Sequence, residues 1–252
     1  MRLDRIIAVR NDKTIYRDGE RCIKIFRDGY SKADILNEAL NTARVEETGL
    51  PIPRVLEIAQ IDDKWAIVFE YAKGKTLSRM IEEAPDDKAS YMARLVELQC
   101  KVHEHRCQML NPLKDKLNMR IEASGLSKDL CHRLIEDLMG MPESDSICHG
   151  DFTPSNVVID TDGAVCILDW AHATRGNAAA DAAITCLRLL SRGDTEGAAL
   201  YMSGFCQASG VESSEVKRWL PIVAAAHLAH CKEREREFLL RMAETGPSAF
   251  SL

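Results

Sequence analysis

The 252-residue sequence has no long hydrophobic run. Its longest apolar stretch, "PIVAAAHLA" from Pro221, is far shorter than the roughly 20 residues with which a helix crosses a bilayer. The first residues, "MRLDRIIAVR", are interrupted by charges and lack the apolar core of a signal peptide. We therefore expect a cytoplasmic protein without a membrane partner.

Paired cysteines and an excess of positive charge are also missing. The nine cysteines are scattered and never spaced as C-x-x-C, so we expect free thiols rather than a disulfide framework. The formal net charge of -6 gives no global positive field to recruit nucleic acid, so we expect no nucleic-acid partner. Hydrophobic residues make up 46% and charged residues 29%, which is typical of a globular protein rather than a disordered chain.

The first seventy residues predict a β-rich region. Short runs of β-branched and aromatic residues predict five strands, at residues 5–10, 13–17, 21–26, 54–61 and 64–71. Turns are expected at Asp18-Gly19 and at Asp62-Asp63, between consecutive strands.

One helix is expected between the third and fourth of these strands. Ser31 is a suitable N-cap, and the helix should end near Thr48, before a glycine. Its apolar positions recur at helical spacing, so we expect a buried stripe of Ile35, Leu36, Ala39, Leu40 and Ala43.

The pattern becomes helical after Gly74. Two helices separated at Pro85 are expected within residues 76–106, another over 127–139, and a helical region over 178–242 interrupted at Gly193, Gly210 and Pro221. The sequence therefore predicts an α+β fold with an N-terminal lobe over residues 1–72 and a C-terminal lobe over residues 73–252.

Residues 149–170, "HGDFTPSNVVIDTDGAVCILDW", combine acidic and amide side chains with short apolar runs. Asp151 and Asn156 follow the H-x-D-x-x-x-x-N spacing of the catalytic loop in kinase-type phosphoryl transfer, and Asp169 ends the next apolar run. Mg²⁺ prefers oxygen ligands, so Asn156 and Asp169 are candidate metal ligands. Asp151 is then left to orient a hydroxyl group and accept its proton.

This segment resembles the aminoglycoside phosphotransferase and choline kinase family, whose motifs are H-G-D-x-x-x-x-N and I/L-D-W/F. The order of elements is similar over nearly the whole chain, and the specific motifs lie between residues 149 and 181. The resemblance implies a two-lobed protein-kinase-like fold, with a small antiparallel β-rich lobe and a larger helical lobe. It also implies ATP- and Mg²⁺-dependent transfer to a hydroxyl group of a small molecule, such as an aminoglycoside-like or amino-alcohol acceptor.

The resemblance also implies roles in nucleotide binding. Lys24 should point away from the sheet face of its isoleucine neighbours and bind the α- and β-phosphates, with Glu38 as its partner on the following helix. "VFEYAKGKTL" resembles the hinge that binds adenine: Phe69 would shape the pocket, and the Glu70 carbonyl and Ala72 amide would bond the base.

Other residues have supporting or open interpretations. His149 is expected to brace the catalytic loop, and Asp181 either supports this loop or only caps its helix. A glycine-rich phosphate loop is missing, because Asn11-Asp12-Lys13-Thr14 stands in its place. Either Lys13 or Thr14 contacts phosphate there, or the segment is a plain hairpin turn.

Two alternative functions are also compatible with the sequence. The first is an atypical small protein kinase, although the short span between Asp169 and Asp181 leaves little room for a peptide-docking segment. The second is a nucleotide-binding pseudokinase module, which the missing glycine-rich loop suggests. The sequence identifies neither the acceptor nor the oligomeric state.

Overall fold

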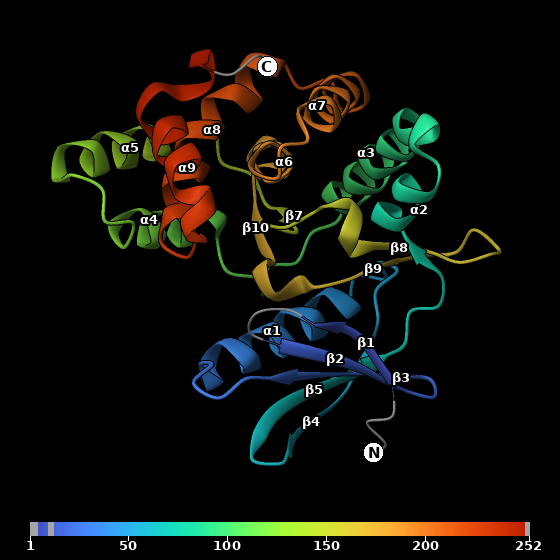
Figure 1. The fold of residues 1–252 in the computed structure, drawn as a ribbon. Helices are drawn as coiled ribbons and strands as arrows, with labels where there is room; N and C mark the ends of the chain where they lie inside the picture. The colour runs from blue at the N-terminus through green and yellow to red at the C-terminus, as the bar shows by residue number, and fades with distance from the viewer. Residues whose placement is uncertain (1–4, 10–12, 250–252) are drawn as a thin grey trace. The chain divides into compact units, whose positions relative to one another are not determined.

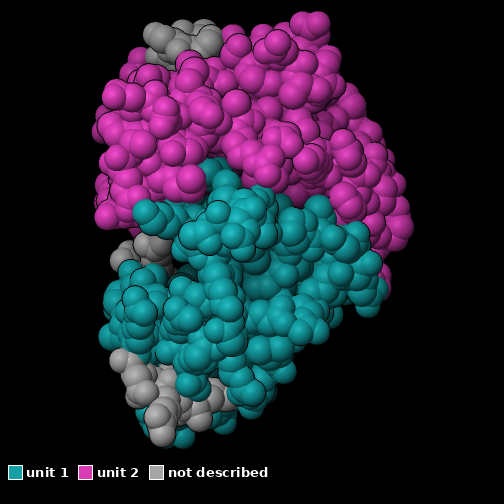
Figure 2. All heavy atoms as spheres, turned by 90° about the vertical axis from the view of Figure 1, so that its right-hand side faces the viewer, with its two compact units in different colours: residues 1–77, 155–172 teal, residues 78–154, 173–252 magenta. Residues whose placement is uncertain are grey.

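The computed structural model describes residues 5–9 and 13–249 (Figure 1). The chain divides into two compact units (Figure 2). Unit 1 comprises residues 1–77 and 155–172, and unit 2 comprises residues 78–154 and 173–252.

Unit 1 contains a five-stranded antiparallel sheet with the order β1-β2-β3-β5-β4. Its strands are β1 (Arg5–Val9), β2 (Lys13–Asp18), β3 (Arg21–Phe26), β4 (Val55–Ile61) and β5 (Lys64–Glu70). They confirm the five predicted strands, except that residue 10 lies outside the described residues. Asp62 and Asp63 join β4 to β5 with φ angles of 48° and 61°, the left-handed values that suit a two-residue hairpin turn.

Helix α1 (Lys32–Glu46) follows β3 and confirms the predicted helix. The Ser31 hydroxyl accepts a hydrogen bond from the Asp34 backbone N–H at 3.3 Å, which caps the first turn. The buried face of α1 differs from the predicted stripe, however. Ile35 and Ala39 are buried, but Leu36, Leu40 and Ala43 are exposed.

The face of α1 that is buried includes polar side chains. Its remaining members are Glu38, Asn41, Thr42 and Val45. The predicted stripe is based on hydrophobicity alone and therefore omits Glu38. In the structure Glu38 is buried and forms an ion pair with Lys24 of β3. This pair turns the helix so that Glu38 faces the sheet and two leucines face outward.

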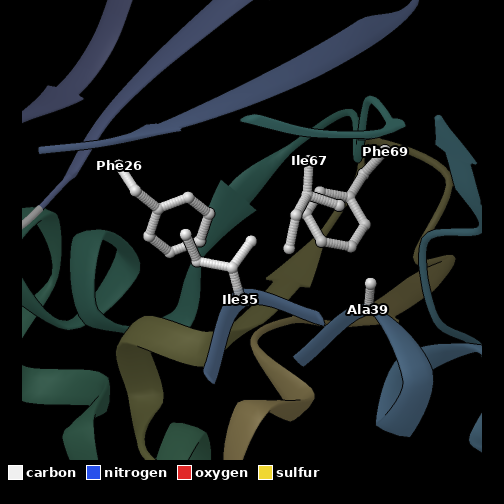
Figure 3. Close-up of a cluster of buried hydrophobic side chains, with 5 residues drawn as sticks. All are labelled: Phe26, Ile35, Ala39, Ile67 and Phe69. Atoms are coloured by element: carbon white, nitrogen blue, oxygen red, sulfur yellow. The ribbon is translucent and has the colours of Figure 1, made fainter. Parts of the chain in front are cut away.

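The core of unit 1 lies between α1 and one face of the sheet. Phe26, Ile67 and Phe69 from the strands pack with Ile35 and Ala39 from α1 (Figure 3). Fully burying a large apolar side chain contributes about 1.5–3 kcal/mol, so this cluster fixes the helix on the sheet. The opposite face of the sheet has its own cluster, made of Ile23, Ile25, Ala66 and Val68.

A second sheet of unit 1 has the order β6-β8-β9. Its strands are β6 (Lys75–Thr76), β8 (Val157–Ile159) and β9 (Val165–Ile167). Gly74 precedes β6 with a φ of 121°, and a Cβ atom there would collide with the backbone of Ile159. The turn between β8 and β9 contains the predicted Asp162-Gly163, and Asp160 Oδ1 accepts hydrogen bonds from Asp162 N at 2.9 Å and Ala164 N at 2.8 Å.

Unit 2 is mainly helical. Its elements are α2 (Leu77–Glu83), α3 (Lys88–Glu104), α4 (Leu113–Glu122), α5 (Lys128–Gly140), β7 (Ser146–Cys148), β10 (Thr174–Gly176), α6 (Ala178–Ser191), α7 (Thr195–Ser209), α8 (Ser213–Leu228) and α9 (Glu233–Thr245). The first residue of α2, Leu77, is still counted in unit 1. Strands β7 and β10 pair antiparallel. Helices α4, α6 and α9 all pack against α8 (Figure 1). No helix of the described chain is long and apolar enough to cross a membrane.

Pro221 lies inside α8, so the predicted interruption there is wrong. A proline within a helix has no N–H to bond the carbonyl one turn earlier. The residues around it, Leu220, Ile222 and Val223, are fully buried, and this packing carries the helix through the proline. The chain leaves the helix at residues 229–232 instead.

Helix α4 is not among the predicted helices, although Leu113, Leu117 and Ile121 recur at helical spacing and are buried. The interruptions at Gly193 and Gly210 are confirmed, because α6 ends before the first and α7 ends at the second. The sheet of unit 1 and the helices of unit 2 confirm the α+β fold class. The predicted lobes, residues 1–72 and 73–252, stay a prediction.

Candidate active site

The β8–β9 hairpin of unit 1 places two of the predicted residues. The Leu168 backbone N–H donates a hydrogen bond to the Asn156 carbonyl at 2.8 Å, so Asn156 and Asp169 lie on neighbouring stretches of backbone. Asp169 has a φ of 65°, which is uncommon for a residue other than glycine. Backbone in this region costs on the order of 1–3 kcal/mol and often marks functional sites.

Lys24 of β3 lies beside Asp169. It is opposite Ile15 and Ile67 in the sheet register and is 5% exposed. Its ammonium group forms an ion pair with Glu38 and lies 3.2 Å from Asp169 Oδ1. The structure therefore brings together Lys24 and Glu38, the partners that the sequence predicts, with Asp169.

Lys13 is a second cation at the same carboxylate. Its Nζ atom lies 3.4 Å from Asp169 Oδ2. Thr14, in the segment that stands in place of the glycine-rich loop, pairs with Ile25 in the sheet. Asn11 and Asp12 of the same segment lie outside the described residues. The register of the β2–β3 hairpin is the feature from which the position of Lys13 can be inferred. Lys24 is opposite Ile15, and Lys13 is two residues before Ile15, so both lysines are on one face.

The charges of this group set its protonation. Burial alone would raise the pKa of Asp169, but Lys24 and Lys13 hold it far below its ordinary value. Burial alone would lower the pKa of Lys24, but the charges of Asp169 and Glu38 raise it well above its ordinary value. Asp169 is therefore an anion and Lys24 a cation throughout the neutral range.

The three residues predicted to bind adenine lie at the end of β5. Phe69 is buried in the cluster of Figure 3. The Glu70 backbone N–H donates to the Arg54 carbonyl at 3.0 Å, and the Glu70 carboxylate pairs with the Arg54 guanidinium. Ala72 follows the strand and is partly exposed. Their contact with adenine stays a prediction.

Asp151 lies in the loop after β7 in unit 2. Arg188 of α6 places its Nε atom 3.0 Å from Asp151 Oδ1. The Asp151 backbone N–H donates to His149 Nδ1 at 3.2 Å, and the His149 ring is fully buried against the edge of Phe152. His149 thus bonds the backbone of this loop, and its role as a brace in catalysis stays a prediction. Arg188 was not predicted, because its position on a distant helix gives no signal in the sequence.

Asp181 is fully buried in the first turn of α6. Its carboxylate accepts hydrogen bonds from the backbone N–H of His149 at 3.1 Å and of Gly150 at 2.7 Å. The helix cap is Asn177, whose side chain accepts from the Ala179 N–H at 2.7 Å. Asp181 is therefore not the helix cap, and it binds the loop that carries Asp151.

Two further side chains complete the surroundings of Asp181. Gln99 donates to it at 2.9 Å, and His103 Nε2 lies 3.0 Å from it. Burial alone would raise the pKa of Asp181, but the bonds from His103 and Gly150 lower it. The structure thus brings the predicted residues together in two groups, Lys24, Glu38, Asn156 and Asp169 in unit 1 and His149, Asp151 and Asp181 in unit 2.

Several solved structures share the fold of this chain. An aminoglycoside-3'-phosphotransferase of type VIII is 19% identical, with a TM-score of 0.66 over 88% of this chain and 92% of that chain. A thermostable mutant of APH(4)-Ia in ternary complex with AMP-PNP and hygromycin B is 14% identical, with a TM-score of 0.68 over 93% and 89%. APH(3'')-Id from Streptomyces rimosus is 17% identical, with a TM-score of 0.59 over 89% and 92%. These likenesses confirm the protein-kinase-like fold.

Sequence comparison assigns the family. No curated protein matches the chain. The model of the phosphotransferase enzyme family (APH) matches residues 9–220, which is most of the sequence and includes the H-G-D and L-D-W motifs. This match confirms the resemblance drawn from residues 149–170. The chain belongs to the phosphotransferase enzyme family and is a phosphotransferase.

Proposed function

We propose that this phosphotransferase moves the γ-phosphoryl group of ATP, in the presence of Mg²⁺, to a hydroxyl group of a small molecule. The observation that carries the proposal is the ionised Asp169 between Lys24 and Lys13. Such a group offers both signs of charge to a metal–nucleotide complex. Related structures support a nucleotide substrate, since one is a complex with AMP-PNP and hygromycin B and another is a complex with ADP and streptomycin.

The donor set of unit 1 fits Mg²⁺. Asp169 supplies a carboxylate that stays ionised at neutral pH, and Asn156 supplies an amide oxygen. Hard cations prefer such oxygen ligands. When bound, Mg²⁺ neutralises phosphate charge that would otherwise repel an incoming hydroxyl group.

The lysines of unit 1 would bind the phosphates. Lys24 is buried and held by Glu38, so its ammonium group is fixed in place before a nucleotide arrives. Lys13 is more exposed and adds a second positive charge on the same face of the sheet. Two fixed cations stabilise the charge on a transferring phosphoryl group without the reorganisation that water would need. Lys13 would thereby replace part of the missing glycine-rich loop.

The residues of unit 2 would act on the acceptor. In the proposal Asp151 orients the acceptor hydroxyl group and accepts its proton, while Arg188 holds one carboxylate oxygen. His149 and Asp181 keep the loop backbone in place through the bonds described above. Phe69, Glu70 and Ala72 would bind adenine. A cytoplasmic location, where ATP is present, agrees with nine cysteines that are all free thiols.

The proposal is tested by coupling ADP release to NADH oxidation over a panel of hydroxyl compounds and peptides. Asp151→Asn should lower kcat by about 10²–10⁴-fold, because it removes a proton acceptor, and should leave the Kd of Mg-ATP unchanged. Asp145→Asn changes a partly exposed aspartate just before β7, which pairs with Arg106, and serves as the control.

Other outcomes distinguish the alternatives. Turnover that is unchanged in Asp151→Asn removes Asp151 from the mechanism. Transfer to peptides alone would identify a protein kinase. Mg-ATP binding without transfer to any acceptor would identify a regulatory pseudokinase.

A further inference from the structure

A buried group of polar side chains lies behind Asp181 in unit 2. Its members are Gln99 of α3, Thr185 of α6 and Tyr201 of α7, and all three are fully buried. Helix α7 packs against both α3 and α6, so the group joins three helices (Figure 1). Buried polar groups lower stability unless they find hydrogen-bond partners, and these three find partners in one another and in Asp181.

The side-chain hydrogen bonds of this group lead toward Asp181. The Tyr201 hydroxyl group donates to Gln99 Oε1 at 2.6 Å, and the Thr185 hydroxyl group donates to the same oxygen at 3.3 Å. Burial raises the pKa of Tyr201 well above its ordinary value, so its hydroxyl group keeps the proton that it donates. Gln99 Nε2 then donates to Asp181 Oδ2 at 2.9 Å. An ionised carboxylate accepts but cannot donate, so the Gln99 amide must turn its nitrogen to Asp181 and its oxygen to the two hydroxyl groups.

His103 of α3 is the second side chain that bonds Asp181, and α7 supports it as well. Its Nε2 atom lies 3.0 Å from Asp181 Oδ2. The Phe205 ring of α7 meets the His103 ring edge-on, with 5.9 Å between centroids, and Tyr201 stacks on Phe205 at 6.0 Å. Tyr201 and Phe205 are both fully buried. Helix α7 thus contacts both side chains that bond the Oδ2 atom of Asp181.

Asp181 connects this group to the loop that carries Asp151. Its Oδ1 atom accepts the Gly150 N–H at 2.7 Å, and its Oδ2 atom accepts the His149 N–H at 3.1 Å. A rotation of the carboxylate would break these backbone bonds, and the Gln99 donor at Oδ2 opposes such a rotation. Catalytic groups need to be held close to their productive geometry, because a misplacement of about 1 Å can lower a rate about 10²-fold.

We propose, on the basis of the proposed function, that Gln99 and Tyr201 are positioning residues for phosphoryl transfer. Tyr201 orients the Gln99 amide, and this amide fixes the carboxylate of Asp181. Asp181 in turn holds the loop that carries Asp151, the proton acceptor of the proposed function. Gln99 and Tyr201 are fully buried, so they act through Asp181 and not by contact with a substrate.

The outer bond of the group is tested with Tyr201→Phe, which removes one hydroxyl group and keeps the ring. The full-length protein is assayed with Mg-ATP and the acceptor that the wild-type protein phosphorylates best. The Gln99 amide loses a donor that fixes its orientation, so kcat should fall about fivefold, the factor for one neutral hydrogen bond, with the KM for ATP unchanged. The matched control is Tyr91→Phe, which changes a partly exposed tyrosine of α3 and should leave both constants unchanged.

The inner bond is tested with Gln99→Glu, which keeps the shape of the side chain and exchanges its amide for a carboxyl group. When protonated, this carboxyl group can donate to Asp181 and accept from Tyr201, as the amide does. When ionised, it repels Asp181 and has no proton to donate. The ratio of variant to wild-type kcat should therefore be near one at low pH and fall about 10²-fold as the pH rises between about 5 and about 9.

Two controls accompany this pH profile. The other titratable side chains that contact Gln99 or Asp181 are Tyr201 and His103, and both proteins contain them, so the ratio reports mainly the introduced carboxyl group. Gln207→Glu changes an exposed glutamine of α7 and should give a ratio near one at every pH. Urea unfolding at each pH identifies the range in which both proteins are folded, and kcat is compared only there.

The outcomes separate this inference from the proposed function. If the wild-type protein transfers phosphate but the Gln99→Glu ratio stays flat while only its stability falls with pH, the group is structural alone. The inference is then overturned and the proposed function stands. An unchanged kcat in Tyr201→Phe would overturn the role of Tyr201. If the wild-type protein transfers phosphate to no acceptor, the proposed function fails, and this inference fails with it.

Discussion

In unit 1 a carboxylate is held by lysine side chains, whereas in unit 2 a carboxylate is held by backbone N–H groups together with two side chains. Asp169 lies between the ammonium groups of Lys24 and Lys13. Asp181 instead accepts two backbone N–H groups, together with bonds from Gln99 and His103. Backbone donors cannot turn to another anion without unfolding their loop, whereas a lysine ammonium group has three N–H donors and can bind a further anion while it stays in place. We therefore expect the unit 1 group to bind phosphate, as proposed, and Asp181 to serve as a fixed support.

The largest effect should come from the buried lysine of unit 1. Lys24→Met should lower kcat/KM by about 10²–10³-fold, as for loss of one fixed donor to a charged transition state. Lys13→Met should lower it only about tenfold, because its side chain is 15% exposed against 6% for Lys24. Steady-state kinetics with Mg-ATP measure both values.

Two controls sharpen this prediction. Lys64→Met removes a half-exposed lysine of β5 far from this group in the sheet register and should change nothing measurable. Lys24→Met also leaves Glu38 buried without its cation, so the double variant with Glu38→Gln should recover stability but not activity. Equal losses for Lys13→Met and Lys24→Met would contradict the distinction between the two lysines.

The support in unit 2 should affect stability more than nucleotide binding. Asp181→Asn puts an amide beside the N–H groups of His149 and Gly150, and should lower the free energy of unfolding by about 2–3 kcal/mol. Urea unfolding measures this change, with the exposed Asp137→Asn of α5 as control. If the Asp181→Asn protein keeps its free energy of unfolding but binds Mg-ATP more weakly, Asp181 contributes to nucleotide binding and the prediction is contradicted.

The sequence predicts the unit 1 strands from local patterns, whereas the resemblance to the family implies the Lys24–Glu38 pair. Strand alternation puts Lys24 on one face, which agrees with that pairing. The predicted stripe of α1 is wrong for Leu36, Leu40 and Ala43, because a hydrophobicity pattern does not include the ion pair that turns the helix. The helix through Pro221 depends on its packing against neighbouring helices, which no local pattern contains.

The surroundings of Asp151 are the part that the sequence does not reveal. Arg188 is 37 positions later in the chain, on helix α6. Its contact with Asp151 forms only when α6 packs beside β7. Motifs therefore identify the reaction class, whereas the partners of Asp151 become visible only in the folded unit 2.

The most direct test of the central claim is calorimetric titration of ATP into the protein with and without Mg²⁺, repeated with Asp169→Asn. The wild-type protein should bind ATP far more tightly with Mg²⁺, and Asp169→Asn should lose this dependence because its neutral amide is a poorer ligand for the cation. Equal ATP affinity with and without Mg²⁺ in the wild-type protein, or an Mg²⁺ dependence that survives in Asp169→Asn, would contradict the account.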